Sequence, residues 1–343
     1  GHKLVGKLPG GHAMAAVLSC LFFGAVSGSA PATVAAIGGL MIPMLSDIGY
    51  DRKWATGLLA SAGALGVMIP PSIPMVMYGV VTGESVSDLF IAGIIPGILV
   101  GLLLCIYCYV YCKKEKPVLK WEAEEKSFLR VLNDSKWAIL MPVIILGGIY
   151  SGLFTATEAA AVACVYALIV SLFIYRTVTF KQLPGILLRA AGLNAPILII
   201  VAAATVLGRA LAIQNVPEAL AATILSVTSN KWMIMLLLNI LLLIVGMLME
   251  TLSAITILAP ILMPVAAGIG IDPIHFGVIM VANLAIGFVT PPVGTNLYTA
   301  ASITGIPVKN LCKAIVGPVI ALLVVQVFLV LIQQLSTFLP SLL

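Results

Sequence analysis

Four stretches of this sequence place small polar side chains, glycine and proline inside apolar segments that are long enough to cross a bilayer. The clearest is Gly287–Asn296, which reads Gly-Phe-Val-Thr-Pro-Pro-Val-Gly-Thr-Asn. Proline removes a backbone donor and clashes with the preceding turn, so a helix must break there. At membrane depth, such a break is tolerated only where it lines a buried or watery cavity. The oxygens that it frees are ligands that hard cations prefer, and few carboxylates accompany them, which favours a weakly held Na⁺.

The other three stretches offer similar oxygen atoms. A second break lies at 66–74, where Pro70-Pro71 precedes Ser72. Two long apolar segments, 11–46 and 232–270, carry small polar residues at their midpoints, at 27–33 and 250–253. Each of these segments is too long for one span and too short for two spans of about 20 residues each. We therefore predict two re-entrant helical hairpins whose tips reach mid-membrane.

Glu250 is the only acidic residue that this arrangement places deep in the membrane. An ionisable group there is costly, so it is a functional candidate that could bind a cation, take a proton or order a substrate hydroxyl. The alternative is a structural hydrogen bond to the neighbouring backbone. Glu158 has a different interpretation, because Thr155-Ala156-Thr157-Glu158 before an alanine-rich run is a capping-box pattern. We expect it to start the helix predicted at 157–175.

The composition limits the class of protein. Of the 343 residues, 61% are hydrophobic and 9% are charged, whereas soluble domains carry about a quarter charged residues. This is typical of an integral membrane protein with many spans. The net charge of +5 comes from basic residues in loops, which are too few to track a nucleic acid. We find no catalytic triad, Walker loop or nucleotide fingerprint, so we predict neither an enzyme nor ATP-driven transport.

An internal repeat organises the chain. Residues Pro43, Gly66 and Pro70 recur as Pro264, Gly287 and Pro291, always 221 positions later, and Gly49, Asp51 and Pro71 repeat in the same way. The order hairpin, broken helix and helix therefore occurs twice, over 11–112 and 232–339. The basic loop at 113–136 is expected in the cytoplasm. If 208–229 lies along the membrane surface as an interfacial arm, the two repeats have inverted topology, as is common in transporters.

Four motifs resemble one known family. They are 27–36, Gly66 to Ser72, 152–161 and 287–296, and in this order they resemble the large membrane subunit of TRAP (tripartite ATP-independent periplasmic) transporters, DctM-like, over essentially the whole chain. That subunit normally begins with further helices, so we expect this sequence to be a fragment that lacks N-terminal helices. The resemblance implies an all-α polytopic membrane protein with the elevator-type fold of a wider ion-transporter superfamily.

The resemblance also implies a domain division and a function. Residues 11–80 and 232–301 would be the two halves of a transport domain; 88–206, with the cytoplasmic loop 113–136, and 310–339 would be scaffold-type helices; 208–229 would be the arm. The protein would be a multi-pass subunit in the bacterial inner membrane that imports a small organic anion by Na⁺ symport. Its partners would be a small four-helix membrane subunit and a periplasmic substrate-binding protein, and it would bind no nucleic acid.

The residue roles carried over from the family fall into three groups. The first Na⁺ site would include Ser27, Ser29, Gly66, Pro70 and Ser72. The second would include Thr251, Ser253, Gly287, Thr290, Gly294 and Thr295. The substrate would lie between the tips, near Ser27, Ser29, Thr33, Glu250 and Asn296. Sialic-acid members carry an acid near the position of Thr33, so the hydroxyl here favours a C4-dicarboxylate or a related small acid.

Two other functions stay open from the sequence. A stand-alone Na⁺- or H⁺-coupled carboxylate transporter of the same superfamily would need no binding protein. An ion channel would need a continuous polar pore, whereas the polar residues of this chain are confined to the predicted mid-membrane tips.

Overall fold

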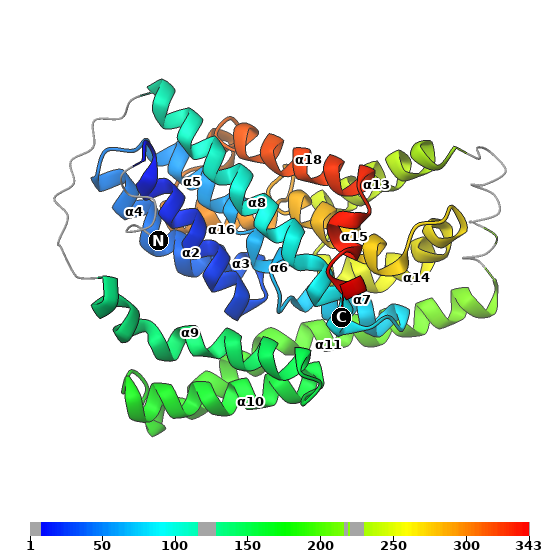
Figure 1. The fold of residues 1–343 in the computed structure, drawn as a ribbon, viewed down its shortest axis with the longest axis horizontal. Coiled ribbons are helices and arrows are strands. Elements are labelled where there is room, and N and C mark those ends of the chain that lie inside the picture. Colours follow the sequence, from blue (N-terminus) through cyan, green and yellow to red (C-terminus); the bar gives the residue numbers. More distant parts are fainter. Residues whose placement is uncertain (1–7, 116–127, 216–218, 220–229, 343) are drawn as a thin grey trace.

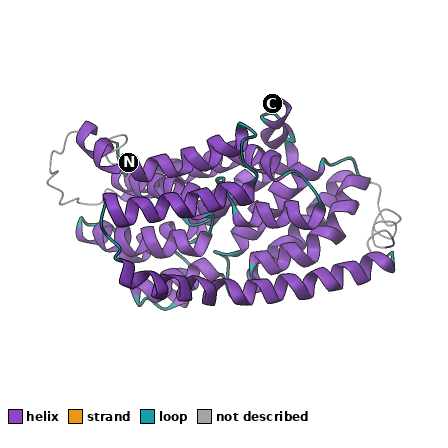
Figure 2. Ribbon diagram, turned by 90° about the horizontal axis from the view of Figure 1, so that it is seen from below, coloured by secondary structure: helices purple, strands orange, loops and turns teal. Residues whose placement is uncertain are grey.

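The computed structural model of the chain describes residues 8–115, 128–215, 219 and 230–342. These residues form helices and connecting loops without β-strands, and the long helices lie side by side along the longest axis of the molecule (Figures 1 and 2). Five of the described helices are long and apolar enough to span a membrane, and a bent helix pair adds a sixth candidate. The all-α architecture expected of a multi-pass membrane protein is therefore present.

The first repeat consists of an interrupted helical segment and a broken helix. Helix α2 ends where Gly28 adopts a left-handed φ of 61°, and the chain turns helical again after Ser29. A second interruption, between Met68 and Ile73, bends the next helix by 42°. The bounds are α2 Gly11–Ser27, α3 Ala30–Thr33, the π-helix η1 Val34–Gly38, α4 Gly39–Asp47, α5 Arg52–Ala62, α6 Leu65–Met68 and α7 Ile73–Thr82.

The second repeat has the same elements. A helix ends at Leu248, two extended residues follow, and a new helix begins at Thr251. After the break at Phe288–Gly294, the chain turns helical again at Thr295. The bounds are α13 Lys231–Leu248, α14 Thr251–Gly268, α15 Pro273–Gly287 and α16 Thr295–Thr304.

The offset of 221 seen in the sequence is also an offset in structure. The segment Ala30–Asp47 corresponds to Thr251–Gly268 at both of its ends. The caps repeat as well: the Asp51 carboxylate accepts a hydrogen bond from Trp54 N at 2.7 Å, and its counterpart Asp272 accepts one from His275 N at 3.0 Å. Each aspartate satisfies a backbone donor that the first helical turn leaves free. Both proline pairs contain a cis peptide bond.

Helices of each repeat pack against helices of the other repeat. Helix α14 of the second repeat packs against α7 of the first, and α16 of the second packs against η1 and α5 of the first. A hydrogen bond from Tyr78 Oη to Pro273 O, 2.8 Å long, joins α7 to the start of α15. One large buried apolar cluster runs through both repeats, so the two halves form a single packed body.

The remaining helices divide into two groups. Helices α8 Val86–Glu115 and α18 Val316–Leu331 pack against each other and against helices of both repeats. Helices α9 Phe128–Tyr150 and α10 Ala156–Ile169 pair with each other and lie, with α11 Leu183–Ile213, along one side of the body (Figure 1). The short elements are η2 Val170–Ile174, η3 Phe180–Gln182, α17 Val308–Leu311, α19 Gln334–Thr337 and η4 Pro340–Leu342.

Two predicted boundaries differ from the structure. Helix α11 continues to Ile213, so the predicted arm 208–229 begins inside a helix, and most of the rest of that arm lies outside the described residues. The predicted single helix 310–339 is interrupted, because α18 ends at Leu331 and α19 follows from Gln334. The capping box at Thr155 is confirmed: Glu158 N donates to Thr155 Oγ1 at 3.3 Å, and Glu158 Oε2 accepts from Thr155 N at 2.8 Å.

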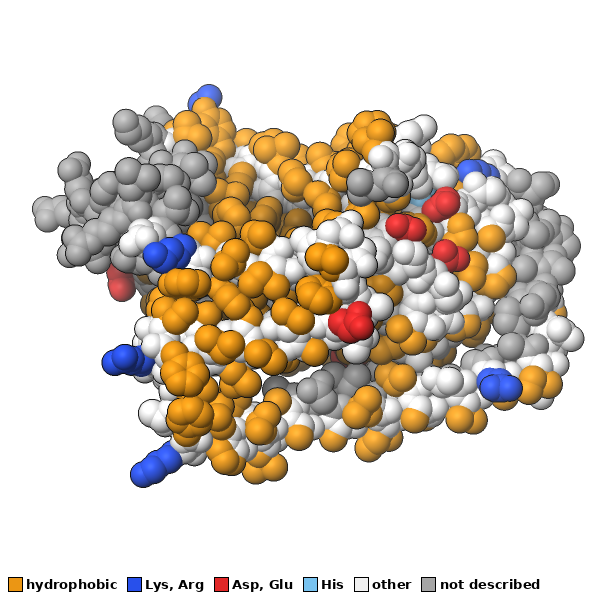
Figure 3. All heavy atoms as spheres, turned by 60° about the horizontal axis from the view of Figure 1, so that its bottom comes forward, with side chains coloured by type: hydrophobic (Ala, Val, Ile, Leu, Met, Phe, Trp, Pro, Cys, Tyr) orange, Lys and Arg blue, Asp and Glu red, His pale blue; other side chains and the backbone are white. Residues whose placement is uncertain are grey.

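The outer surface is consistent with a lipid environment. Long apolar side chains of α11 are exposed, among them Leu188 at 75% and Ile199 at 71%. The face shown in Figure 3 is largely apolar, and its Lys and Arg side chains lie toward the two ends of the molecule. Apolar flanks with basic ends are the expected pattern for a bundle whose helices cross a bilayer.

Candidate binding site between the two repeats

The two helix interruptions that were predicted as tips, at 27–33 and 250–253, meet around one pocket. Ser29 and Glu250, which are related by the 221-residue offset, both line it. Its volume is about 130 Å³, below the roughly 300–1,000 Å³ of typical ligand pockets, so only a small molecule would fit in it. The wall comes from both tips and both broken helices: Gly28, Ser29, Ala30, Pro31, Val67, Ile73, Pro74, Glu250, Thr251, Leu252 and Phe288.

The second tip presents a fixed carboxylate and a free hydroxyl. Glu250 is the N-cap of α14, and its Oε2 accepts hydrogen bonds from Leu252 N at 2.8 Å and Ser253 N at 3.2 Å. These bonds satisfy donors of the first helical turn, and the helix N-terminus favours negative charge on the cap. The next residue, Thr251, is 1% exposed, and its Oγ1 has no hydrogen-bond partner among the described residues.

The hydroxyls of the first tip are paired with each other and with the backbone. Ser27 Oγ lies 3.1 Å from Thr33 Oγ1, and Thr33 Oγ1 donates to Ser29 O at 2.8 Å. The tip also rests on the first break, because Ile73 N donates to Gly28 O at 3.2 Å. A Cβ at Gly66 would lie 2.4 Å from Thr33 Oγ1 and 2.5 Å from Ser29 O, so only glycine lets the tip sit this close.

The second tip rests on the second break in a similar way. Val293 N donates to Met247 O at 3.2 Å. Gly246 and Gly287 bring the backbones of α13 and α15 into direct contact, since a Cβ at Gly287 would lie 2.3 Å from the carbonyl carbon of Gly246. In each repeat, the predicted tip thus lies against the break that follows it in the chain.

Unpaired oxygen atoms are concentrated at the second break. Thr295 Oγ1 and Asn296 Oδ1 are buried and have no hydrogen-bond partner in the described part of the chain. Gly294, with a φ of 43°, lies against the carbonyl oxygens of Thr290 and Phe288. Leaving a buried polar atom unpaired costs about 1–3 kcal/mol, and a cation bound by these oxygens would offset that cost. The donor set of this break therefore fits Na⁺.

The first break fits a cation less well in this conformation. Ser72 Oγ donates to Val67 O at 2.6 Å and also accepts from Met75 N at 3.3 Å, so it acts as the N-cap of α7. The hydroxyls of Ser27 and Thr33 are engaged in the tip. A cation at this break would have to take its ligands from backbone carbonyls or displace these hydrogen bonds.

Comparison with known proteins gives the family. The model of the tripartite ATP-independent periplasmic transporter DctM component matches residues 2–335. This chain belongs to the DctM family. The resemblance predicted from the four sequence motifs is thereby confirmed.

Several curated relatives are similar over nearly the whole chain. The isethionate TRAP transporter permease protein DctMQ of Oleidesulfovibrio alaskensis is 44% identical over 99% of this chain and 52% of the relative. The C4-dicarboxylate TRAP transporter large permease protein DctM of Pseudomonas aeruginosa is 42% identical over 98% of this chain and 79% of the relative. The sialic acid TRAP transporter large permease protein SiaM of Vibrio cholerae is 37% identical over 99% of this chain and 80% of the relative. This DctM-family chain thus spans about half of DctMQ and about four fifths of the other two.

The predicted substrate residues are partly brought together in this family member. Ser29 and Glu250 both line the tip pocket, and Thr33 Oγ1 donates a hydrogen bond to the backbone oxygen of Ser29. Asn296 lies outside the lining of this pocket: it is fully buried, and its Nδ2 donates to Ala60 O of α5 at 3.2 Å. Ser27 lines a neighbouring cavity of about 320 Å³ between the first tip and helices α9 and α10.

The predicted cation ligands differ in whether their side chains already have hydrogen-bond partners. Thr251 and Thr295 have unpaired hydroxyls, whereas Thr290 Oγ1 donates to Ile286 O at 2.8 Å. Gly66 and Gly287 have no side chain and so allow neighbouring backbone segments to pack closely against them. Ser253 is buried beside the Glu250 cap, and Pro70 belongs to the cis pair that opens the first break.

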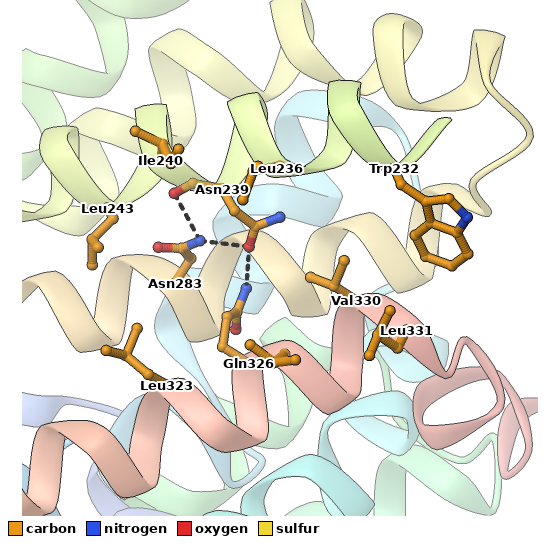
Figure 4. Close-up of a pocket in the computed structure, with 11 residues that line it drawn as sticks. Trp232, Leu236, Asn239, Ile240, Leu243, Asn283, Leu323, Gln326, Val330 and Leu331 are labelled. Carbon is orange, nitrogen blue, oxygen red and sulfur yellow. Dashed lines mark hydrogen bonds between the residues drawn. The ribbon is translucent and has the colours of Figure 1, made fainter. Parts of the chain in front are cut away.

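A buried amide cluster was missed by the sequence reasoning. Asn239 Oδ1 accepts hydrogen bonds from Asn283 Nδ2 and Gln326 Nε2, both 2.7 Å long, and so joins α13, α15 and α18 (Figure 4). The three amides form the polar floor of an apolar groove of about 420 Å³. Each of them is a polar residue in the middle of an apolar helix, which is the signal that could have identified them.

Proposed function

We propose that this chain is the large permease subunit of a Na⁺-coupled importer of small organic acids, located in the bacterial inner membrane. A periplasmic substrate-binding protein would deliver the substrate, and a small four-helix membrane subunit would complete the permease. The observation that carries the proposal is the meeting of both tips and both broken helices around one pocket, with unpaired oxygens beside it. Transporters build their sites from such discontinuous helices near the bilayer midplane.

The packing supports an elevator-type mechanism. Helices α8 and α18 pack against each other and against both repeats, so this assembly could move as a unit. Helices α9 and α10 face the first tip across the 320 Å³ cavity, and small or apolar side chains such as Ala160, Ala163 and Ile149 line it. Because the described residues that line this interface carry no interlocking charges, the two repeats could slide along α9 and α10 with little change in energy. Such a movement would expose the tip pocket first to one side of the membrane and then to the other. In this proposal α8 and α18, which the family resemblance assigned to the scaffold, would move with the two repeats, because they pack against helices of both.

Uptake into vesicles tests the proposal. The full-length permease would be reconstituted with its small subunit, and uptake of labelled small acids measured with the binding protein added. We expect uptake to require both the binding protein and an inward Na⁺ gradient. Unchanged uptake after collapse of the gradient would refute Na⁺ coupling, and uptake without a binding protein would favour the stand-alone transporter.

The role of Thr295 can be tested with one substitution. Thr295→Val removes the unpaired hydroxyl and keeps the shape of the side chain, so the protein should fold with unchanged stability. We expect the Na⁺ concentration that gives half-maximal uptake to rise about tenfold, which corresponds to about 1.4 kcal/mol of lost binding.

Thr299→Val is the matched control for this substitution. It lies one turn further along α16, and its Oγ1 already donates to Thr295 O at 2.8 Å. Its Na⁺ dependence should remain that of the wild type. If Thr295→Val also shows wild-type Na⁺ dependence, Thr295 is not a ligand.

A further inference from the structure

The tip pocket has an unusual charge for the site of an organic anion. Its polar side chains are those of Ser29, Glu250 and Thr251, and its other lining residues are apolar or glycine. Among these residues, the only ionisable side chain is therefore an acid. A second carboxylate placed next to Glu250 would be repelled, so a plain dicarboxylate is poorly matched to this pocket.

The geometry gives each polar group a different task. Glu250 is held at the N-terminus of the 18-residue helix α14 through Oε2, which accepts from Leu252 N and Ser253 N. A carboxylate has lone pairs on two oxygens, so this capping leaves it able to accept further hydrogen bonds. Thr251 provides an independent indication of a ligand, because this residue lines the pocket and its buried Oγ1 has no hydrogen-bond partner among the described residues. Hydroxyls such as those of Thr251 and Ser29 can donate to a substrate carboxylate.

We propose that the substrate is a small acid that also carries a hydroxyl or ammonium donor, a hydroxy acid or an amino acid, and that Glu250 selects it by accepting a hydrogen bond from that donor. This inference rests on the proposed function and narrows its substrate class. The carboxylate of the substrate would point toward Ser29 and Thr251, and its donor toward Glu250. The two tips occupy equivalent positions in the repeat but carry different side chains. Each tip would thus bind one end of the substrate.

The expected discrimination is large enough to measure. Glu250 is exposed at the tip, and a hydrogen bond from a substrate donor to its charged carboxylate favours the acid that carries the donor over the analogue that lacks it. We expect the dissociation constant to be at least about tenfold lower for the donor-bearing acid than for its unsubstituted parent.

Two matched triads of acids test this inference. Succinate, malate and aspartate differ at one carbon by a hydrogen, a hydroxyl or an ammonium group, and propionate, lactate and alanine differ in the same way. Binding of each to the purified full-length permease complex in NaCl would be measured from the ligand-dependent rise in melting temperature. In any triad that binds, the hydroxy or amino member should bind at least about tenfold more tightly than the parent.

Two variants assign the discrimination to Glu250. Glu250→Gln keeps an oxygen for the α14 cap but removes the charge, and it should reduce the preference to less than about threefold. Glu158→Gln removes an acid from the exposed cap of α10, away from the pocket, and should leave the preference unchanged.

The binding panel tests the substrate class, whereas the vesicle uptake experiment tests the proposed function. Equal or tighter binding of the parent acids, a preference that survives Glu250→Gln, or no binding by any member would overturn the inference. The proposed function would still be decided by the vesicle uptake experiment, which does not depend on this panel.

Discussion

Gly287→Ala is expected to lower the melting temperature of the purified protein by about 5 °C and to abolish transport. The new Cβ would lie 2.3 Å from the carbonyl carbon and 2.5 Å from the Cα of Gly246. Both atoms are backbone, so relief requires α13 to separate from α15. Overpacking of this kind costs typically 1–3 kcal/mol, and each kcal/mol corresponds to roughly 2–4 °C in a chain of a few hundred residues. The separation would also displace the second tip from its break.

Gly147→Ala is the control for this substitution. Gly147 lies inside α9, and a Cβ there would meet nothing within 4 Å. Alanine is favoured over glycine in a helix interior by about 1 kcal/mol, so the melting temperature should stay level or rise. Wild-type melting of Gly287→Ala would show that the two backbones can separate at no cost, and would contradict the close contact described here.

The broken helices could be predicted because their causes are local. A proline pair and nearby glycines disrupt a helix wherever they occur, so the breaks at 66–74 and 287–296 are visible in the sequence. The caps at Asp51 and Asp272 are local as well, since each aspartate bonds to a backbone N–H three residues ahead. These local signals repeat at one offset, and in both repeats the backbone of the first interruption contacts that of the break that follows it.

The pairing of side chains across helices could not be predicted in the same way. Thr33 Oγ1 bonds within the tip, and Asn296 Nδ2 bonds to Ala60 of the other repeat while its Oδ1 has no partner among the described residues. These outcomes depend on how each helix is rotated toward its neighbours, which a 221-residue offset does not determine. The boundary between α11 and the predicted arm 208–229 is a local matter. Good helix formers such as Ala210 and Leu211 carry α11 to Ile213, and most of the arm lies outside the described residues.

Asn239→Leu is expected to destabilise the protein by about 2–4 kcal/mol, through loss of the amide cluster that joins α13, α15 and α18. Asn239 Oδ1 accepts two bonds of 2.7 Å, so its removal weakens the pairing of both Asn283 and Gln326. Each amide keeps a longer bond to a backbone carbonyl, of 3.0 Å and 3.2 Å, which keeps the cost from being larger. The measurement is the melting temperature of the purified protein in detergent, with a decrease of at least about 5 °C expected.

The triple variant Asn239→Leu, Asn283→Leu, Gln326→Met separates lost pairing from lost packing. Replacing all partners of a buried polar network by apolar groups of similar size can be nearly neutral, because no donor is then left unpaired. The triple variant should therefore melt above the single variant although it carries more substitutions. If it melts lower, the amides stabilise the fold by their shape in the groove rather than by their hydrogen bonds. If Asn239→Leu alone is neutral, the interhelical bonds contribute little, as many hydrogen bonds within membranes do.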